Sequence, residues 1–263
     1  LLKLKLKTKV ICMLVYKKKK LSEIFHAAEY VSINRVLQNS NSQIVAFSPW
    51  SVNALNGSFG IFVRDDDSIE NPTDLNNKEI AVEAGTGSYY TTIDDLEKYI
   101  DIENLKFKKL GDPHERLISL INHEVSASSL LGIYAEMAPL FGLRKLIDST
   151  RRRGTLMVAV QDLPVDSIQS FITATNRAIS NINEHPENFT RYYCSYIEPI
   201  ISELPEHMQN QLNDFINTVK IPKWDVWQTY PKDEFDQICN WLKSRNLLEN
   251  PKNYDELVNQ SVF

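Results

Sequence analysis

The pattern of hydrophobic and polar positions changes near residue 164. Before it, short runs of branched and aromatic residues, typical of β-strands, alternate with amphipathic stretches typical of helices. The runs predict strands at 44–47, 58–63, 80–82, 106–110, 125–131, 143–148 and 155–160. The stretches between them predict helices at 86–99, 113–122 and 135–141, the second with Asp112 as N-cap and Pro113 at its first position. This alternation predicts an α/β fold built from parallel βαβ units.

Beyond Pro164 the hydrophobic positions recur at helical spacing. One apolar stripe contains Ile168, Phe171, Ile172, Thr175, Ile179 and Ile182. Further helices are expected at about 187–197, 205–217, 232–245 and 254–260. No low-complexity linker separates the two regimes, so any second lobe is reached through short crossings of the chain.

Composition is that of an ordinary globular protein, with 263 residues, 43% hydrophobic and 24% charged. This length allows one large domain or two small lobes. The net charge of −5 is unevenly spread, because residues 1–20 contain 8 Lys and no acidic residue. The remaining residues contain 21 Lys and Arg against 34 Asp and Glu, which argues against a nucleic-acid partner.

The Lys-rich start of the chain, residues 1–20, lacks the features of a secretory signal peptide. Its apolar centre is short, and a run of four Lys follows it without a small-residue cleavage site. The alternation in LKLKLKTKV is compatible with an edge strand, and a foreign or degraded start is an equal alternative.

The three cysteines are scattered and odd in number. Cys12, Cys194 and Cys239 show neither a CxxC spacing nor a His/Cys metal pattern, so neither a disulfide framework nor a metal site is expected. We interpret all three as core or incidental thiols.

The segment KEIAVEAGTGSYY, residues 78–90, predicts a buried strand, a glycine-bracketed turn and a helix start. Gly85 and Gly87 permit a tight turn and a close approach to the backbone, and Thr86 or Ser88 can cap the following helix. The free N–H groups of such a helix end attract an anion or a polar group. A turn that is only well capped is the alternative, since GTGS matches neither a P-loop nor a dinucleotide-binding fingerprint.

Three segments in order carry a resemblance to a known family. They are SIENPTDLNNKEIAVEAGTGSYY (68–90), LGDPHERLISLINHEVSASSLLGIYAEMA (110–138) and IDSTRRRGTLMVAV (147–160). Together they resemble the substrate-binding proteins of ABC transporters for nitrate, sulfonates and thiamine precursors, a group with the periplasmic binding protein type 2 fold. The resemblance covers roughly residues 21–263. It departs from the family at the Lys-rich start, which replaces the usual first strand and ligand loop, and at Ser126, where the family has Asp.

The resemblance implies two α/β lobes with a ligand cleft between them, closing like a hinge. The first lobe is expected to comprise residues 1–62 and 155–263, with an atypical or truncated start, and the second lobe residues 66–150. The segments 60–64 and 153–157 are the expected hinge strands.

The resemblance also implies which residues line the cleft, because ligands of open α/β sheets bind beyond the C-terminal ends of the strands. Turns and crossings at such ends supply the expected ligand-binding residues, namely Phe25, His26, Glu29, Trp50, Ser51, Gly85, Thr86, Gly87, Ser88, Tyr89, Gly132 and Tyr134. Aromatic rings with a few polar groups suit a flat ring or a small organic anion. A core role for Trp50 and a purely structural role for His26 remain alternatives.

The function expected from the resemblance is capture of a small organic anion or heterocycle, such as a sulfonate, nitrate or a pyrimidine, without a cofactor or catalysis. The expected partners are an ABC permease and its ATPase subunits, the expected location is outside the cytoplasmic membrane, and the expected state is a monomer. One alternative is a cytoplasmic enzyme of the same fold, either a thiamine-pyrimidine synthase or a desulfinase. The chain lacks the synthase's pyridoxal lysine, with Ser22 in its place, and its cysteine cluster. A truncated, non-functional relative is the remaining alternative.

Overall fold

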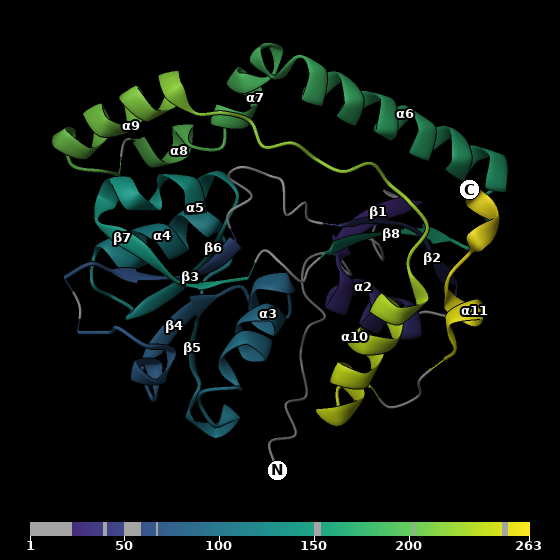
Figure 1. Ribbon diagram of the computed structural model, residues 1–263, viewed down its shortest axis with the longest axis horizontal. Helices are drawn as coiled ribbons and strands as arrows, with labels where there is room; N and C mark the ends of the chain where they lie inside the picture. Colours follow the sequence, from purple (N-terminus) through teal and green to yellow (C-terminus); the bar gives the residue numbers. More distant parts are fainter. Residues whose placement is uncertain are drawn as a thin grey trace.

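Two separate β-sheets organise the chain (Figure 1). The structure is a computed structural model that describes residues 23–38, 41–49, 59–66, 68–149, 154–201, 203–248 and 252–263. The three-stranded sheet consists of β1 (Ile24–Ala28), β2 (Ser42–Pro49) and β8 (Gly154–Val160). The five-stranded sheet consists of β3 (Phe59–Arg64), β4 (Glu79–Val82), β5 (Lys106–Lys109), β6 (Ala127–Leu131) and β7 (Leu143–Asp148).

Strand direction differs between the two sheets. In the five-stranded sheet, ordered β5-β4-β6-β3-β7, β4 runs parallel to both β5 and β6, which confirms the predicted parallel units. β3 runs antiparallel to β6 and β7. In the three-stranded sheet, β8 lies between β1 and β2 and is antiparallel to both, so the prediction of parallel units was wrong there. The reason is that β8 returns from the other sheet, a path that local periodicity does not encode.

The helices of the structure follow the predicted order with shifted bounds. They are α2 (Glu29–Gln38), α3 (Gly87–Leu96), α4 (Pro113–Ile121), α5 (Ile133–Met137), α6 (Val165–Glu184), α7 (Thr190–Cys194), α8 (Glu198–Ile201), α9 (Glu206–Thr218), α10 (Lys232–Ser244) and α11 (Tyr254–Leu257). Short 3-10 turns cover Pro72–Leu75, Ile102–Asn104, Ala138–Phe141, Pro186–Asn188 and Gln260–Val262. The helix expected at about 187–197 is a 3-10 turn followed by the short α7. Asp112 is the N-cap residue of α4 and Pro113 its first residue, as predicted. None of the helices in the described ranges has the length and apolarity needed to cross a membrane.

Each sheet is covered by helices on both faces. Helix α3 packs on one face of the five-stranded sheet, where Ile93 and Leu96 join a cluster with Ile80. Helices α2, α10 and α11 cover one face of the three-stranded sheet, and α6 covers the other through Ile168 and Ile172. Phe171, expected in the apolar stripe of α6, is instead 43% exposed.

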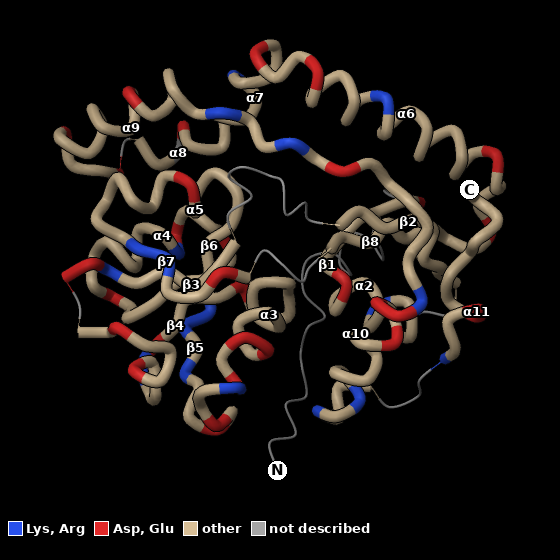
Figure 2. The backbone as a smooth tube through the Cα atoms, viewed as in Figure 1, with Lys and Arg blue, Asp and Glu red and all other residues tan. Residues whose placement is uncertain are grey.

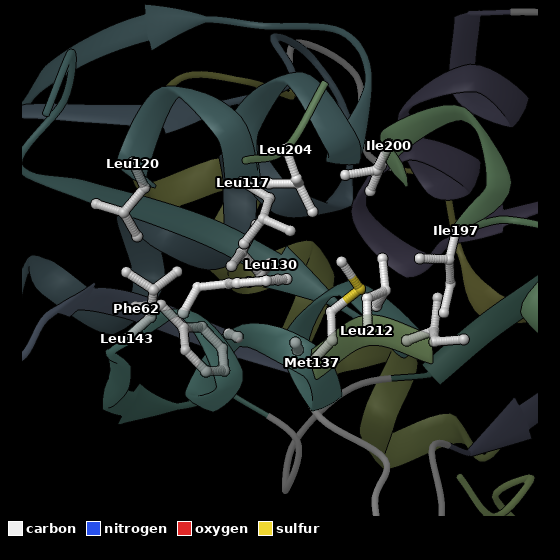
Figure 3. Close-up of a cluster of buried hydrophobic side chains, with 14 of the residues drawn as sticks. Phe62, Leu117, Leu120, Leu130, Met137, Leu143, Ile197, Ile200, Leu204 and Leu212 are labelled. Atoms are coloured by element: carbon white, nitrogen blue, oxygen red, sulfur yellow. The ribbon is translucent and has the colours of Figure 1, made fainter. Parts of the chain in front are cut away.

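Helices α7, α8 and α9 do not pack where the lobe division places them. Residues 155–263 were all expected in the first lobe. However, Ile197, Ile200 and Leu212 pack with Leu117 and Leu130 of the five-stranded sheet and its helix α4 (Figure 3). Helix α6 therefore leads from one sheet to the other, and the chain returns to the three-stranded sheet before Gln228, which pairs with Phe47.

The strands expected to form the hinge each belong to one sheet, and their role as a hinge remains a prediction. β3, which includes residues 60–64, is an interior strand of the five-stranded sheet, and all six of its residues are buried. β8 begins at Gly154 and belongs wholly to the three-stranded sheet. The chain thus passes between the sheets after β2 and after β7, rather than along these strands. The division into two lobes remains a prediction.

Candidate functional site

The turn between β4 and α3 is closed by its own hydroxyl groups. Gly85 has a φ of 74°, the left-handed conformation that glycine adopts without strain. The Thr86 hydroxyl donates to the Glu83 carbonyl at 2.9 Å, and the Glu83 N–H donates to the Ser88 hydroxyl at 3.0 Å. Thr86 is the N-cap residue of α3 but makes no side-chain cap hydrogen bond. Both hydroxyls predicted to bind a ligand therefore already hold the turn in shape.

A glycine is needed at position 87 because the chain there packs directly against the β1–α2 junction. A Cβ atom added at Gly87 would lie only 2.7 Å from the Cβ of Ala28, a distance that real side chains do not adopt. Ala28 ends β1 of the three-stranded sheet, and Gly87 begins α3 on the five-stranded sheet. The β1–α2 junction and the β4–α3 turn thus meet directly, which brings two of the predicted site segments together from different sheets.

Phe25 and His26 were expected in a turn but lie within β1, opposite Val158 and Met157 of β8. His26 is exposed, and its ring centroid lies 6.4 Å from that of Trp227. The Arg35 guanidinium stacks 3.8 Å above the ring of half-buried Phe25. Of these residues, only His26 is widely accessible to a solute.

The carboxyl group of Glu29, a predicted ligand residue, makes its hydrogen bonds within the protein. The side chain is buried, with 1% of the residue exposed. One carboxyl oxygen accepts the Gly154 N–H at 2.9 Å, and the other accepts the Tyr230 hydroxyl at 2.8 Å. Burial and the neighbouring Glu29 raise the pKa of Tyr230. Glu29 therefore ties α2 to β8 and to the segment before α10, which is a structural role the sequence did not indicate.

The β6–α5 turn lies at the same edge of the sheet as the β4–α3 turn, because β4 and β6 are parallel neighbours. Gly132 has φ 56° and ψ −139°, and a Cβ atom there would meet nothing within 4 Å. Its backbone therefore borders open space, as a ligand contact requires. The hydroxyl of Tyr134 donates to the carbonyl of Tyr196 at 2.7 Å, and burial raises the pKa of Tyr134.

Tyr89 follows the β4–α3 turn, and its ring packs against other aromatic rings of the protein. Its ring makes edge contacts with Phe107 at 5.1 Å and with Tyr90 at 5.4 Å, measured between ring centroids. Burial raises the pKa of Tyr89. Trp50 and Ser51 lie outside the described residues.

Arg116 and Glu83 form a charged pair at this edge that the sequence analysis did not single out. The Arg116 side chain is 1% exposed and donates from Nε to the Ser129 carbonyl at 3.0 Å. It also donates to the carbonyls of Leu110 and Gly111, and it lies 4.0 Å from the Glu83 carboxylate. The sequence feature that could have revealed this pair is an arginine at a core-facing position of an amphipathic helix, because a buried charge requires partners.

Glu83 is the accessible member of this pair, because its side chain is 45% exposed. Burial raises the pKa of Glu83, and the nearby Arg116 charge opposes that effect. A carboxyl group at the mouth of the turn favours a solute that can donate hydrogen bonds over a bare anion. Asp and Glu residues occur on helices of both sheets, and along the tube in Figure 2 they are interspersed with Lys and Arg.

The described residues offer no built metal site, since no group of three or more His, Cys, Asp and Glu side chains among them lies close enough to hold an ion. A hollow of about 390 Å³ lies away from these turns and is lined by Gln43 and residues 255–261.

Comparison with solved structures gives the fold. The sulphonate-binding protein SsuA of Escherichia coli superposes with a TM-score of 0.71 at 14% identity, covering 95% of this chain and 79% of that one. SsuA of Xanthomonas axonopodis pv. citri, an alkanesulfonate-binding protein bound to MOPS, gives a TM-score of 0.69 at 13% identity, with 90% and 80% covered.

The chain has the periplasmic-binding-protein fold. This confirms the predicted α/β class and fold. An enzyme shares the fold, because the desulfurization enzyme DSZB gives a TM-score of 0.61 at 14% identity, covering 92% of this chain and 84% of that one. No protein-family model matches the chain, and no curated protein is significantly similar to it in sequence.

Proposed function

We propose that the protein binds a small organic solute between its two sheets and delivers it to a membrane transporter. The observation that carries this proposal is the meeting of the β1–α2 and β4–α3 turns from different sheets at Ala28 and Gly87. The β6–α5 turn shares this edge, and Gly132 there borders open space. In open α/β sheets such strand ends are where ligands bind.

The solute class proposed is a small organic anion or a heterocycle, for example a sulfonate or a pyrimidine. The sulfonate-binding neighbours support the first, and the half-exposed Glu83 beside the turn supports the second. Helix α3, which begins at Gly87, offers backbone donors to either class.

The proposed partners are an ABC permease and its ATPase, with the protein acting as a monomer outside the cytoplasmic membrane. The transporter partners are supported by two neighbours of this fold, one the ligand-binding component of an ABC-type import system and one a periplasmic sulfonate-binding protein assigned to an ABC transporter.

Binding is tested first by a thermal-shift screen with sulfonates, nitrate, pyrimidines, riboflavin and pyridoxal phosphate. A solute at about 100 times its Kd stabilises the fold by about 2.7 kcal/mol, a shift of a few degrees. Any hit is then measured by calorimetry on Glu83→Gln and on the control Glu103→Gln. Glu103 is exposed and precedes β5, at the opposite edge of the sheet.

We expect Glu83→Gln to change the Kd by about tenfold, because the carboxylate repels an anion beside it and accepts hydrogen bonds from a donor-rich heterocycle. The affinity rises for an anion and falls for a donor-rich heterocycle, so the sign identifies the class. Glu103→Gln leaves the Kd unchanged. Equal effects of the two variants would contradict the placement of the site, and the absence of any hit with a well-folded protein would contradict the proposed solutes.

The alternative of an enzyme is supported by the shared fold with DSZB, but by no activated thiol in the described residues. Burial raises the pKa of Cys239 to about 11 and also raises the pKa of Cys194. Both thiols are therefore protonated at neutral pH and poor nucleophiles. Cys12 lies outside the described residues.

A further inference from the structure

Helix α3 makes a second set of contacts between the sheets. It packs on the five-stranded sheet, but Tyr90 belongs to the buried cluster of the three-stranded sheet, together with Tyr30 of α2. The rings of Tyr30 and Tyr90 stack with centroids 5.9 Å apart, and Trp241 of α10 meets Tyr30 at 4.8 Å. We call these residues, with Asp94, Glu97 and Arg245, the α3 seam.

The polar part of the seam converges on one carboxylate. Trp241 Nε1 donates to Glu97 Oε1 at 3.1 Å, and Arg245 Nε donates to Glu97 Oε2 at 2.8 Å. A second nitrogen of Arg245, Nη2, also donates to Glu97 Oε1, which makes the pair bidentate. The Arg245 guanidinium lies 4.2 Å above the Trp241 ring.

This geometry is stronger than that of a common surface ion pair. The Glu97 and Arg245 side chains are 14% and 21% exposed, so solvent screens them only in part. Bidentate arginine–carboxylate pairs are among the strong hydrogen-bonded contacts of proteins. The Tyr30 hydroxyl adds a bond to Asp94 at 3.3 Å.

The seam nevertheless has the composition of an interface that can open. It combines three charged groups with three aromatic rings, two of which belong to the buried cluster of the three-stranded sheet. Interfaces between parts of one chain that move relative to each other are typically polar and small. Tyr90, Asp94 and Glu97 follow one face of α3 at i, i+4 and i+7, so this one face carries all the residues that α3 contributes to the seam.

Helix α3 connects the seam to the candidate site. The same helix begins at Gly87, which touches Ala28 of the other sheet. The contacts from Tyr90 to Glu97 therefore hold the first turn of α3 against the β1–α2 junction.

We infer that the α3 seam is a latch whose contacts favour the closed arrangement of the two sheets. The strength of the latch then sets the fraction of molecules that are open to a solute. This inference requires no particular solute. It is tested on ligand-free protein, so its failure would be separate from a failure of the proposed function.

The test uses a disulfide engineered by Ala28→Cys and Gly87→Cys. The two positions are close enough in the closed form, and a disulfide needs Cβ atoms about 3.8 Å apart, so the turns must part by about 1 Å. Peptide mapping distinguishes this disulfide from products of the native cysteines. The rate of its formation under a mild oxidant reports the closed fraction.

The perturbation is Glu97→Ala, which removes the acceptor of all three polar contacts to α10. The matched control is Glu124→Ala, because Glu124 accepts from Lys108 at 2.7 Å and from Ser119 at 3.2 Å within the five-stranded-sheet part alone. We expect rapid cross-linking in the parent chain, little change with Glu124→Ala, and about tenfold slower cross-linking with Glu97→Ala.

Two outcomes would overturn the latch. Absence of cross-linking in the parent chain means that the ligand-free protein is open. Equal rates with Glu97→Ala and Glu124→Ala mean that the seam does not hold the sheets together.

If the double-cysteine chain does not fold, X-ray scattering of the single variants replaces it. The latch then requires a larger radius of gyration for Glu97→Ala than for Glu124→Ala, and equal radii refute it. The milder Trp241→Phe keeps the ring packing and removes one bond, and we expect it to fall between the two.

Discussion

Removal of the Glu29 carboxyl group separates a structural role from a ligand-binding role. Glu29 and Tyr230 are each 1% exposed, and both carboxyl oxygens of Glu29 accept bonds, from Gly154 N–H and from the Tyr230 hydroxyl. Glu29→Ala leaves both donors buried without this partner. Hydrogen bonds to a charged group contribute about 1.5–3 kcal/mol each, so we expect a loss of about 3–5 kcal/mol in the free energy of unfolding.

Urea unfolding followed by circular dichroism measures this loss. With a slope of about 3 kcal/mol per molar urea, the midpoint falls by about 1 M or more. Tyr230→Phe removes one of the two bonds and should cost about half as much, while Glu29→Gln keeps one acceptor and should lie between the wild type and Glu29→Ala.

The opposite result would refute the structural role. If Glu29 faced a solute, Glu29→Ala would leave the midpoint unchanged or raise it and would weaken binding alone. A midpoint equal to that of the wild type, with Tyr230→Phe also neutral, would show that the two bonds do not form in solution.

Two further predictions concern stability. Gly60→Ala places a Cβ atom 2.2 Å from the Ile147 carbonyl oxygen, so we expect a loss of about 2–4 kcal/mol in urea unfolding. Gly111→Ala, where a Cβ atom meets nothing within 4 Å, should be near neutral, and a similar loss in both variants would contradict the steric argument. Burial raises the pKa of Glu136 to about 7 from 4.5, against the Tyr193 hydrogen bond, so its contribution to stability is present below pH 4.5 and is lost as pH rises through 7. Glu136→Gln should therefore remove about 1–2 kcal/mol of the wild-type decline between pH 5 and 8 in thermal melts, and an unchanged pH profile would refute this.

Local features of the fold followed directly from the sequence. Strand β4 and the helix start at Asp112–Pro113 were predictable because a short apolar run and an N-cap followed by proline act through neighbouring residues only. The direction of β8 was not predictable in this way, since pairing with β1 and β2 joins residues far apart in the chain.

The candidate site likewise has features that the local sequence predicts and features that only distant residues determine. The GTGS segment indicated a tight turn, and Gly85 has the positive φ that such a turn needs. The partner of Gly87 is Ala28, which no local pattern around either residue indicates. Glu29 looked like an accessible polar group beside a turn, yet Gly154 and Tyr230 enclose it from distant parts of the chain.

The sequence by itself determined the succession of strands and helices, because hydrophobic period, glycine and capping residues act over a few residues. The tertiary structure alone decided which sheet each amphipathic helix covers. Helices α7–α9 pack against the five-stranded sheet, and α3 also contacts α2 and α10. The sequence of an apolar helix face does not specify which surface it will cover. Burial of that face is non-directional, and only the shape and charge of the assembled surfaces select one partner over another.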